Sequence, residues 1–394
     1  NPFIIHVRRL HTHTDGRVTG EITIVVKDKK KDKVVHSNSQ INFAADRTRS
    51  GLAKELSIKN PNFPWSDMID QLCQLVPERI REGEPLLEMW AGLEDEQISP
   101  PKYLLEPFIL ENLPNVIFGD PGTLKSTLAL ALASILLLNK HDNSLGLIPN
   151  GQDIRTLYLD WEVDYKTLTW QLSRLQKGMN LPPVVVSYRH CYLPLTQDIE
   201  QIQQHIEKSK ANLIIIDSLG PACGGELKEA QPALDFFRAL RKLNVSSLIL
   251  AHTSKDTEKP KSIYGNIYFT AQARNVWEVR KVQEAGEDEM DIALFHTKPP
   301  PFAKKHRPMG FHFQFETDKT SIESRDPKSV AEFVERMGNN TRILNLLKDG
   351  ALEPKEIAET LTINPASVRT SLKRLTAKNL VVKVGDRYGL LSKF

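Results

Sequence analysis

The first hydrophobic pattern along the chain is a short alternation of apolar and polar positions. β-type runs at residues 21–26 and 34–36 flank a lysine-rich stretch, which predicts a hairpin with a charged tip. Helical patterns follow at residues 50–56 and 65–75. We therefore expect residues 1–95 to form a small α+β accessory domain.

The middle of the chain alternates continuous apolar runs with helical stretches. The apolar runs are rich in Leu, Ile and Val, as strands buried on both faces should be. This alternation predicts an α/β domain over residues 96–325, with a parallel sheet covered by helices. We expect core strands at residues 115–118, 156–159, 184–188, 213–216, 247–251 and 276–279.

The pattern changes again towards the end of the chain. Helical patterns at residues 341–347, 354–361 and 365–375 precede two β-type runs that flank a Gly-Asp pair, which is typical of a tight turn. Three helices and a hairpin predict a winged helix-turn-helix domain over residues 336–394. The basic side chains expected to face DNA phosphates there are Arg369, Lys373, Arg374, Lys378 and Arg387.

Composition places the chain among soluble globular proteins. Its 394 residues are 40% hydrophobic and 26% charged, and the net charge of +3 means that any DNA contact must come from local patches. The three cysteines lie far apart without CxxC spacing, which argues against a zinc site and suits a reducing compartment. The longest mostly apolar run, residues 128–138, is too short to cross a bilayer. We expect a cytoplasmic protein without a membrane partner, and a fragment of a longer one, because it begins at Asn1.

A glycine-containing segment between an apolar strand and an apolar helix carries the first candidate chemistry. It reads Gly119, Asp120, Pro121, Gly122, Thr123, Leu124, Lys125, Ser126 and Thr127. In a phosphate loop, glycines let backbone N–H groups converge on an anion, and the helix N-terminus adds its dipole. We expect these residues to bind ATP, with Lys125 on the β and γ phosphates and the Ser126 hydroxyl on Mg²⁺. Leu124 stands where the usual pattern has glycine, and its side chain must point away from the phosphates, which is feasible if its φ is negative.

Polar side chains also end three of the other expected strands. Asp217 ends one apolar run and is expected to hold Mg²⁺. Asp160 and Glu162 end another, and either could orient or deprotonate the attacking water, since spacing alone does not choose between them. His252 ends a third and is expected to sense the γ-phosphate, because strand carboxyl ends form the ligand crevice of such sheets.

In the order of these motifs, residues 100–315 resemble the RecA-like P-loop ATPases, and within them the RepA-like branch of replicative hexameric helicases. The resemblance implies a RecA-like parallel-sheet core. It favours Glu162 over Asp160 as the catalytic base, and it places Asp217 at the Walker B position and His252 at the polar sensor.

The resemblance also implies a ring whose subunits share their ATP sites. In that family a basic residue near the end of a strand reaches the neighbouring subunit as an arginine finger; Arg280 is the first candidate here, with Arg274 and Lys281 as alternatives. Two pore loops correspond to residues 220–231 and 253–266. The lysines of the second loop are expected to follow a single-stranded DNA backbone: Lys255, Lys259 and Lys261.

The leading hypothesis is therefore a DNA-dependent ATPase, a ring-forming (hexameric) helicase or translocase in the replication of a phage, plasmid or mobile element. The alternative is an ATP-switched DNA-binding regulator, or a recombination mediator, with slow hydrolysis and no unwinding. Leu124 and the modest charge of the expected pore loops favour the regulator. By resemblance, the part of the protein before Asn1 is expected to hold a primase-type or other replication domain.

Overall fold

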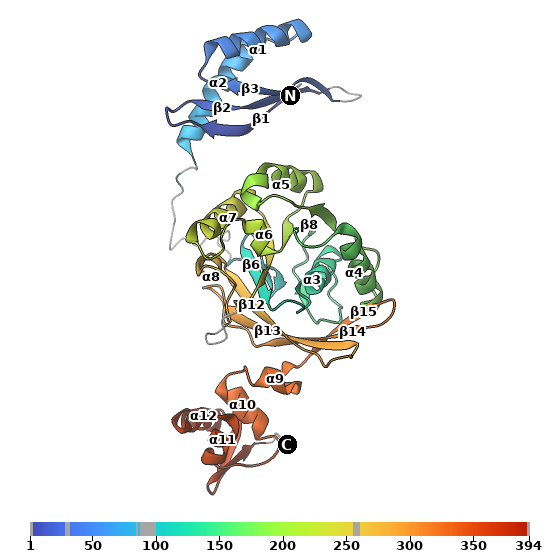
Figure 1. Ribbon diagram of the computed structural model, residues 1–394, viewed down its shortest axis with the longest axis vertical. Helices are drawn as coiled ribbons and strands as arrows, with labels where there is room; N and C mark the ends of the chain where they lie inside the picture. The colour runs from blue at the N-terminus through green and yellow to red at the C-terminus, as the bar shows by residue number, and fades with distance from the viewer. Residues whose placement is uncertain (1–2, 28–31, 84–85, 87–99, 255–260, 392–394) are drawn as a thin grey trace. The chain divides into compact units, whose positions relative to one another are not determined.

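A computed structural model describes residues 3–27, 32–83, 86, 100–254 and 261–391 (Figure 1). Its backbone contacts divide the chain into two compact units, Asn1–Ile98 and Ser99–Phe394. Each unit has a hydrophobic core of its own.

The first unit is a three-stranded antiparallel sheet with two helices. The sheet has the order β1-β2-β3, with β1 (Phe3–Thr12), β2 (Val18–Val26) and β3 (Lys33–Asn42). Alternate residues of β2 are buried in one core with α1 (Asp46–Lys59) and α2 (Trp65–Glu82). The expected hairpin is β2–β3. β1 was not predicted, because basic and histidine side chains interrupt its apolar alternation.

The second unit is built on a nine-stranded mixed sheet with the order β15-β14-β13-β12-β6-β11-β10-β8-β9. The strands from β12 to β9 in this order are parallel, and β13, β14 and β15 continue the sheet antiparallel. The parallel strands are β6 (Pro114–Gly119), β8 (Thr156–Asp160), β9 (Ser187–His190), β10 (Leu213–Asp217), β11 (Ser246–His252) and β12 (Asn275–Val282). The antiparallel strands, which were not predicted, are β13 (Glu289–Lys298), β14 (Met309–Phe315) and β15 (Thr320–Arg325).

Five of the six expected core strands are confirmed within a few residues, and the expected strand at 184–188 is wrong in its bounds. Pairing with β8 begins only at Ser187, opposite Leu157. Residues 184–186 instead line a mostly apolar hollow beside α4 (Tyr165–Gly178).

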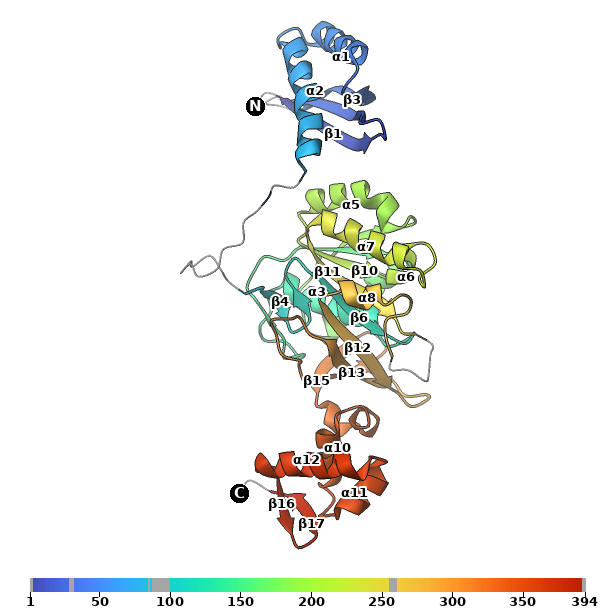
Figure 2. The same cartoon turned by 90° about the vertical axis from the view of Figure 1, so that its left-hand side faces the viewer.

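Helices cover both faces of the parallel part of the sheet (Figures 1 and 2). Ile117 of β6 belongs to the core with α3 (Lys125–Leu137) and α4, whereas its neighbours Val116 and Phe118 belong to the core on the other face. The helices of that second core are α5 (Leu195–Ser209), α6 (Leu219–Cys223), α7 (Ala230–Leu243) and α8 (Tyr268–Gln272). Because successive strand side chains point to opposite faces, burial on both sides requires the continuous apolar runs seen in the sequence.

Shorter elements complete the unit. A small sheet joins β4 (Tyr103–Glu106), β5 (Ile109–Leu110) and β7 (Ile148–Pro149), and η1 (Pro327–Ser329) and α9 (Ala331–Val334) follow β15. The C-terminal segment has a small core of its own, and its elements are α10 (Asn339–Leu346), α11 (Pro354–Leu361), α12 (Pro365–Ala377), β16 (Val381–Val384) and β17 (Arg387–Leu390). Within the described residues, no helix combines the length and the apolar composition that a membrane span requires.

Candidate nucleotide site

The predicted phosphate loop and polar residues lie together at the carboxyl ends of four parallel strands, β6, β8, β10 and β11. The register places His252 of β11 opposite Gly119 of β6, and Asp217 of β10 opposite Asp160 of β8. Parallel strands with this register end at the same level, so the phosphate loop, the acids and the histidine share one crevice.

The phosphate loop follows β6 directly, and its first glycine is required by packing. A Cβ atom on Gly119 would lie 2.7 Å from the carbonyl oxygen of Val279 and 2.9 Å from the hydroxyl of Thr123. Gly122 has a φ of +71°, in the region that favours glycine. The Thr123 hydroxyl donates a 2.8 Å hydrogen bond to the carbonyl of Asp120, which closes the loop in front of α3.

The backbone of Leu124 does not have the negative φ that the sequence analysis considered for it. Leu124 precedes α3 with φ +57° and ψ +28°, which is the left-handed region. Its side chain is partly buried against the core below α3. A non-glycine residue in this region costs about 1–2 kcal/mol, so the fold of the loop dictates the backbone here and the apolar contact offsets part of that cost.

Lys125 lies inside the loop. Its Nζ donates to the carbonyls of Gly119 (3.1 Å) and Asp120 (3.0 Å), and the side chain is buried. Burial lowers the pKa of Lys125, while the carboxylates of Asp217, Glu162 and Asp120 act in the opposite direction. The ammonium group is therefore bound by loop carbonyls at the place from which it could contact a phosphate.

Ser126 and Asp217 form the candidate Mg²⁺ site. The Asp217 carboxylate accepts hydrogen bonds from the Ser126 hydroxyl and, at 2.6 Å, from the Tyr158 hydroxyl. Burial raises the pKa of Asp217, and a bound cation would stabilise this buried carboxylate. Hydroxyl and carboxylate oxygens are ligands that Mg²⁺ accepts, so these two residues fit the ion. Among the described residues no group of three or more His, Cys, Asp or Glu side chains could hold a metal, so the other ligands would be water and phosphate oxygens.

The geometry separates the roles of Asp160 and Glu162. Asp160 is fully buried, and its Oδ1 accepts hydrogen bonds from the backbone N–H groups of Glu162 (2.9 Å) and Val163 (3.0 Å). Its Oδ2 accepts a 2.9 Å hydrogen bond from the Tyr188 hydroxyl. Asp160 therefore fixes the turn after β8, and the Glu162 side chain, 36% exposed, is the one that water can reach.

Two polar groups hold the Glu162 carboxylate. His252 Nε2 lies 3.4 Å from its Oε1, and the Ser218 hydroxyl donates to the same oxygen. The hydrogen bond from His252 is the main reason why the pKa of Glu162 lies below its ordinary value, and the bond from Ser218 adds to it. Ser218 and Tyr158 were not predicted from the sequence, although Ser218 directly follows the strand-end Asp217.

Lys261 lies at the phosphate loop. Its ammonium forms an ion pair with the Asp120 carboxylate, to which the Thr253 hydroxyl also donates. Burial acts to raise the pKa of Asp120, but these two hydrogen bonds and the positive charges of Lys261 and Arg280 together outweigh it and lower the pKa. The structure thus gives Lys261, expected on a DNA-binding loop, an intrachain partner in the candidate nucleotide site. Lys255 and Lys259 lie outside the described residues.

The three candidates for the arginine finger lie in different places. Arg274 precedes β12 at the amino ends of the parallel strands, away from the phosphate loop. There its backbone N–H donates to the carbonyl oxygen of Pro114, the first residue of β6. The guanidinium of Arg280 forms a 2.6 Å ion pair with Glu278 of its own strand and is mostly buried. Lys281 is exposed, and its Nζ would lie 3.3 Å from a Cβ atom on Gly122 of the same chain.

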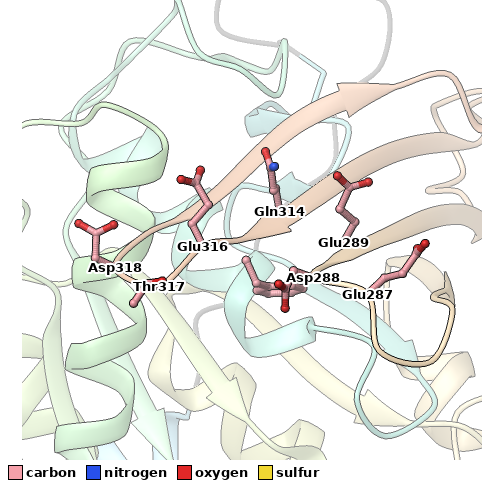
Figure 3. Close-up of a pocket in the computed structure, with 8 residues that line it drawn as sticks. Glu287, Asp288, Glu289, Gln314, Glu316, Thr317 and Asp318 are labelled. Carbon is pink, nitrogen blue, oxygen red and sulfur yellow. The ribbon is translucent and has the colours of Figure 1, made fainter.

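A second hollow, of about 600 Å³, lies between the β12–β13 and β14–β15 turns (Figure 3). Five of its lining residues are acidic: Glu287, Asp288, Glu289, Glu316 and Asp318. Carboxylates repel phosphate groups, so this hollow does not compete with the phosphate loop for a nucleotide.

The basic residues expected to contact DNA in the C-terminal segment are all exposed: Arg369, Lys373, Arg374, Lys378 and Arg387. Val368, Leu372 and Leu375 are buried, so α12 presents its basic residues on the surface that its core does not use. Arg387 also lies 3.9 Å from Glu356. Their contact with DNA remains a prediction.

Comparison with known proteins adds one finding to this geometry. The chain has no match among curated proteins. A family model described as an AAA domain matches residues 80–258, which include the phosphate loop, Glu162, Asp217 and His252. Residues 80–258 are therefore similar to the AAA domain, a family of P-loop ATPases that are in general nucleotide hydrolases.

Proposed function

We propose that the chain hydrolyses ATP with Mg²⁺ at the carboxyl ends of β6, β8, β10 and β11. The observation that carries the proposal is that Lys125, Ser126, Asp217 and Glu162, which are up to 92 positions apart in the sequence, surround one phosphate loop. These side chains supply a phosphate-binding cation, two oxygen ligands for Mg²⁺ and a base.

Each residue then has a task that its surroundings support. The N–H groups of the phosphate loop and Lys125 hold the phosphates, and Ser126 with Asp217 binds Mg²⁺, which would neutralise charge that develops on them. Glu162 orients and deprotonates the attacking water, and its lowered pKa keeps it ionised at neutral pH. His252 contacts Glu162 at the end of β11. As the sensor of the γ-phosphate, it would move Glu162 according to whether that phosphate is present.

We further propose that DNA stimulates this activity and that the chain works in a ring. The resemblance to RepA-like hexameric helicases supports a hexamer that moves along single-stranded DNA in the replication of a phage, plasmid or mobile element. Three helices and a hairpin with exposed basic residues support a winged helix-turn-helix that binds duplex DNA at α12 and β17.

A second candidate function is an ATP-switched regulator with slow hydrolysis. The left-handed backbone of Leu124 favours it, because strain in the phosphate loop disfavours the conformation that must hold the phosphates through the reaction. The regulator and the motor make opposite predictions for the effect of DNA on turnover.

The deciding experiment is steady-state ATP hydrolysis without DNA, with single-stranded DNA and with duplex DNA. Lys125→Ala is the negative control, and Glu162→Gln is compared with Asp160→Asn, because only the first should remove the base while the fold of the turn is retained. Stimulation by single strands that is lost in Lys125→Ala supports a motor, and a forked-duplex unwinding assay follows. Hydrolysis that ignores DNA supports the regulator, and a wild-type chain that neither binds nor hydrolyses ATP refutes the proposal.

A further inference from the structure

The strand β12 brings a lysine to the phosphate loop of its own chain. β12 lies parallel and directly adjacent to β6, and Val279 pairs with Gly119, the last residue of β6. β12 therefore continues beyond the point at which β6 turns into the loop. Lys281 is the second residue beyond this pairing, so its position at the loop follows from the sheet register.

The side chain of Lys281 ends beside Gly122 of the loop. Its Nζ would lie 3.3 Å from a Cβ atom on Gly122, which is exposed and has a positive φ. The ammonium group thus lies against a glycine whose backbone can approach an anion closely.

Lys281 differs from the other cations near the loop in having no carboxylate partner among the described residues. Lys261 is paired with Asp120, and Arg280 is paired with Glu278. Lys125 is held by carbonyl groups, which carry only partial charges. The charge of Lys125 is also offset in part by the nearby carboxylates of Asp217, Glu162 and Asp120. Among the described residues, Lys281 is therefore the exposed cation at the loop whose charge remains available to a phosphate.

We infer that Lys281 is a phosphate-binding cation that acts in cis, on the nucleotide held by its own chain. This inference rests on the proposed ATPase function and names a further catalytic residue of that site. A cation at this position stabilises the charge that spreads over the phosphoryl oxygens in the transition state, as a finger supplied in cis does in other NTPases. It differs from the expectation that a residue of β12 reaches the site of a neighbouring subunit.

The first test compares Lys281→Ala with Lys281→Arg and with the matched control Lys208→Ala. Lys208 is exposed near the end of α5, shortly before the amino end of β10 and thus away from the carboxyl ends of the strands. Its removal should therefore leave hydrolysis unchanged. We expect Lys281→Ala to lower kcat about 10²- to 10³-fold, the usual effect of removing one preorganised electrostatic donor. Lys281→Arg keeps the charge and should retain at least about a tenth of the wild-type kcat.

The second test separates action in cis from action in trans. Lys125→Ala has an intact Lys281 and a defective loop, whereas Lys281→Ala has the reverse. If Lys281 acts in cis, an equimolar mixture of the two variants hydrolyses ATP no faster than the sum of the separate proteins. If it acts in trans, mixed interfaces join an intact loop to an intact Lys281 and the mixture recovers activity.

A nucleotide-binding assay with fluorescent ATP and ADP analogues distinguishes a failure of the Lys281 inference from a failure of the ATPase proposal. We expect Lys281→Ala to bind the ATP analogue about tenfold more weakly and the ADP analogue almost normally. Wild-type kcat in Lys281→Ala, or recovery in the mixture, overturns the inference and leaves the ATPase proposal standing. A wild-type chain that binds neither analogue overturns both.

Discussion

Leu124 offers a sharp test of the structure, because the sign of a small difference in stability depends on its backbone. The residue has φ +57° immediately before α3, where a negative φ was considered from the sequence alone. We consider the pair Leu124→Gly and Leu124→Ala. Both substitutions remove the leucine contacts with the core below α3, so the comparison between them cancels most of that loss.

The expected difference follows from two opposing effects. Glycine relieves the left-handed cost of about 1–2 kcal/mol that alanine retains. Glycine also gives the unfolded chain more conformational freedom, which lowers the stability by about 0.5–1 kcal/mol. Leu124→Gly should therefore be more stable than Leu124→Ala by about 0.5–1 kcal/mol, the reverse of the order at an ordinary helical position, where alanine is favoured by about 1 kcal/mol.

Thermal unfolding of the nucleotide-free chain measures this difference. For a unit of this size, the expected gap corresponds to a Tm about 1–2 °C higher for Leu124→Gly. Gln204, exposed in the middle of α5, serves as the control, and Gln204→Ala should there melt above Gln204→Gly. An alanine variant at position 124 that melts at or above the glycine variant would refute the left-handed assignment.

Three further predictions concern the site and its support. Burial raises the pKa of Asp217 above its ordinary 3.8, so the ionised carboxylate destabilises the folded protein as pH rises through the shifted pKa. Asp217→Asn should therefore raise the Tm of the nucleotide-free protein at pH 7, give no gain in Tm below about pH 3.8, and abolish hydrolysis. A lower Tm at pH 7 would contradict this. The pKa of Glu162 lies below 4.5 chiefly because His252 donates to it, so His252→Ala should move the acidic limb of the kcat/KM profile to higher pH, and an unmoved limb would remove His252 from that role. Arg174 donates to carbonyl groups of the β14–β15 turn, so Arg174→Ala should lower the free energy of unfolding by about 2–3 kcal/mol in urea. The exposed control Arg238→Ala should lower it by under about 1 kcal/mol. Equal effects would show that the turn does not depend on these hydrogen bonds.

The sequence determined the parallel core and the location of the candidate nucleotide site. Strands buried on both faces must be continuously apolar, so their positions could be read from hydrophobic runs, and the polar residues that end these runs had to lie at the strand ends. A Cβ atom on Gly119 would clash with Val279, and Gly122 has a positive φ, so the fold of the loop requires glycine at both positions. These two glycines made the loop recognisable in the sequence. β13, β14 and β15 were missed, because they extend the sheet antiparallel with a less continuous apolar pattern.

Only the tertiary structure decided what each polar residue contacts. Asp160 and Glu162 are two positions apart and chemically alike, and the N–H groups and the Tyr188 hydroxyl around Asp160 separate their roles. Lys261 and Lys281 lie more than 130 positions from the phosphate loop in sequence, and the pairing of β12 with β6 and the bond to Asp120 bring them to it. Local sequence sets which residues can end a strand, but the register between distant strands sets which of those ends meet.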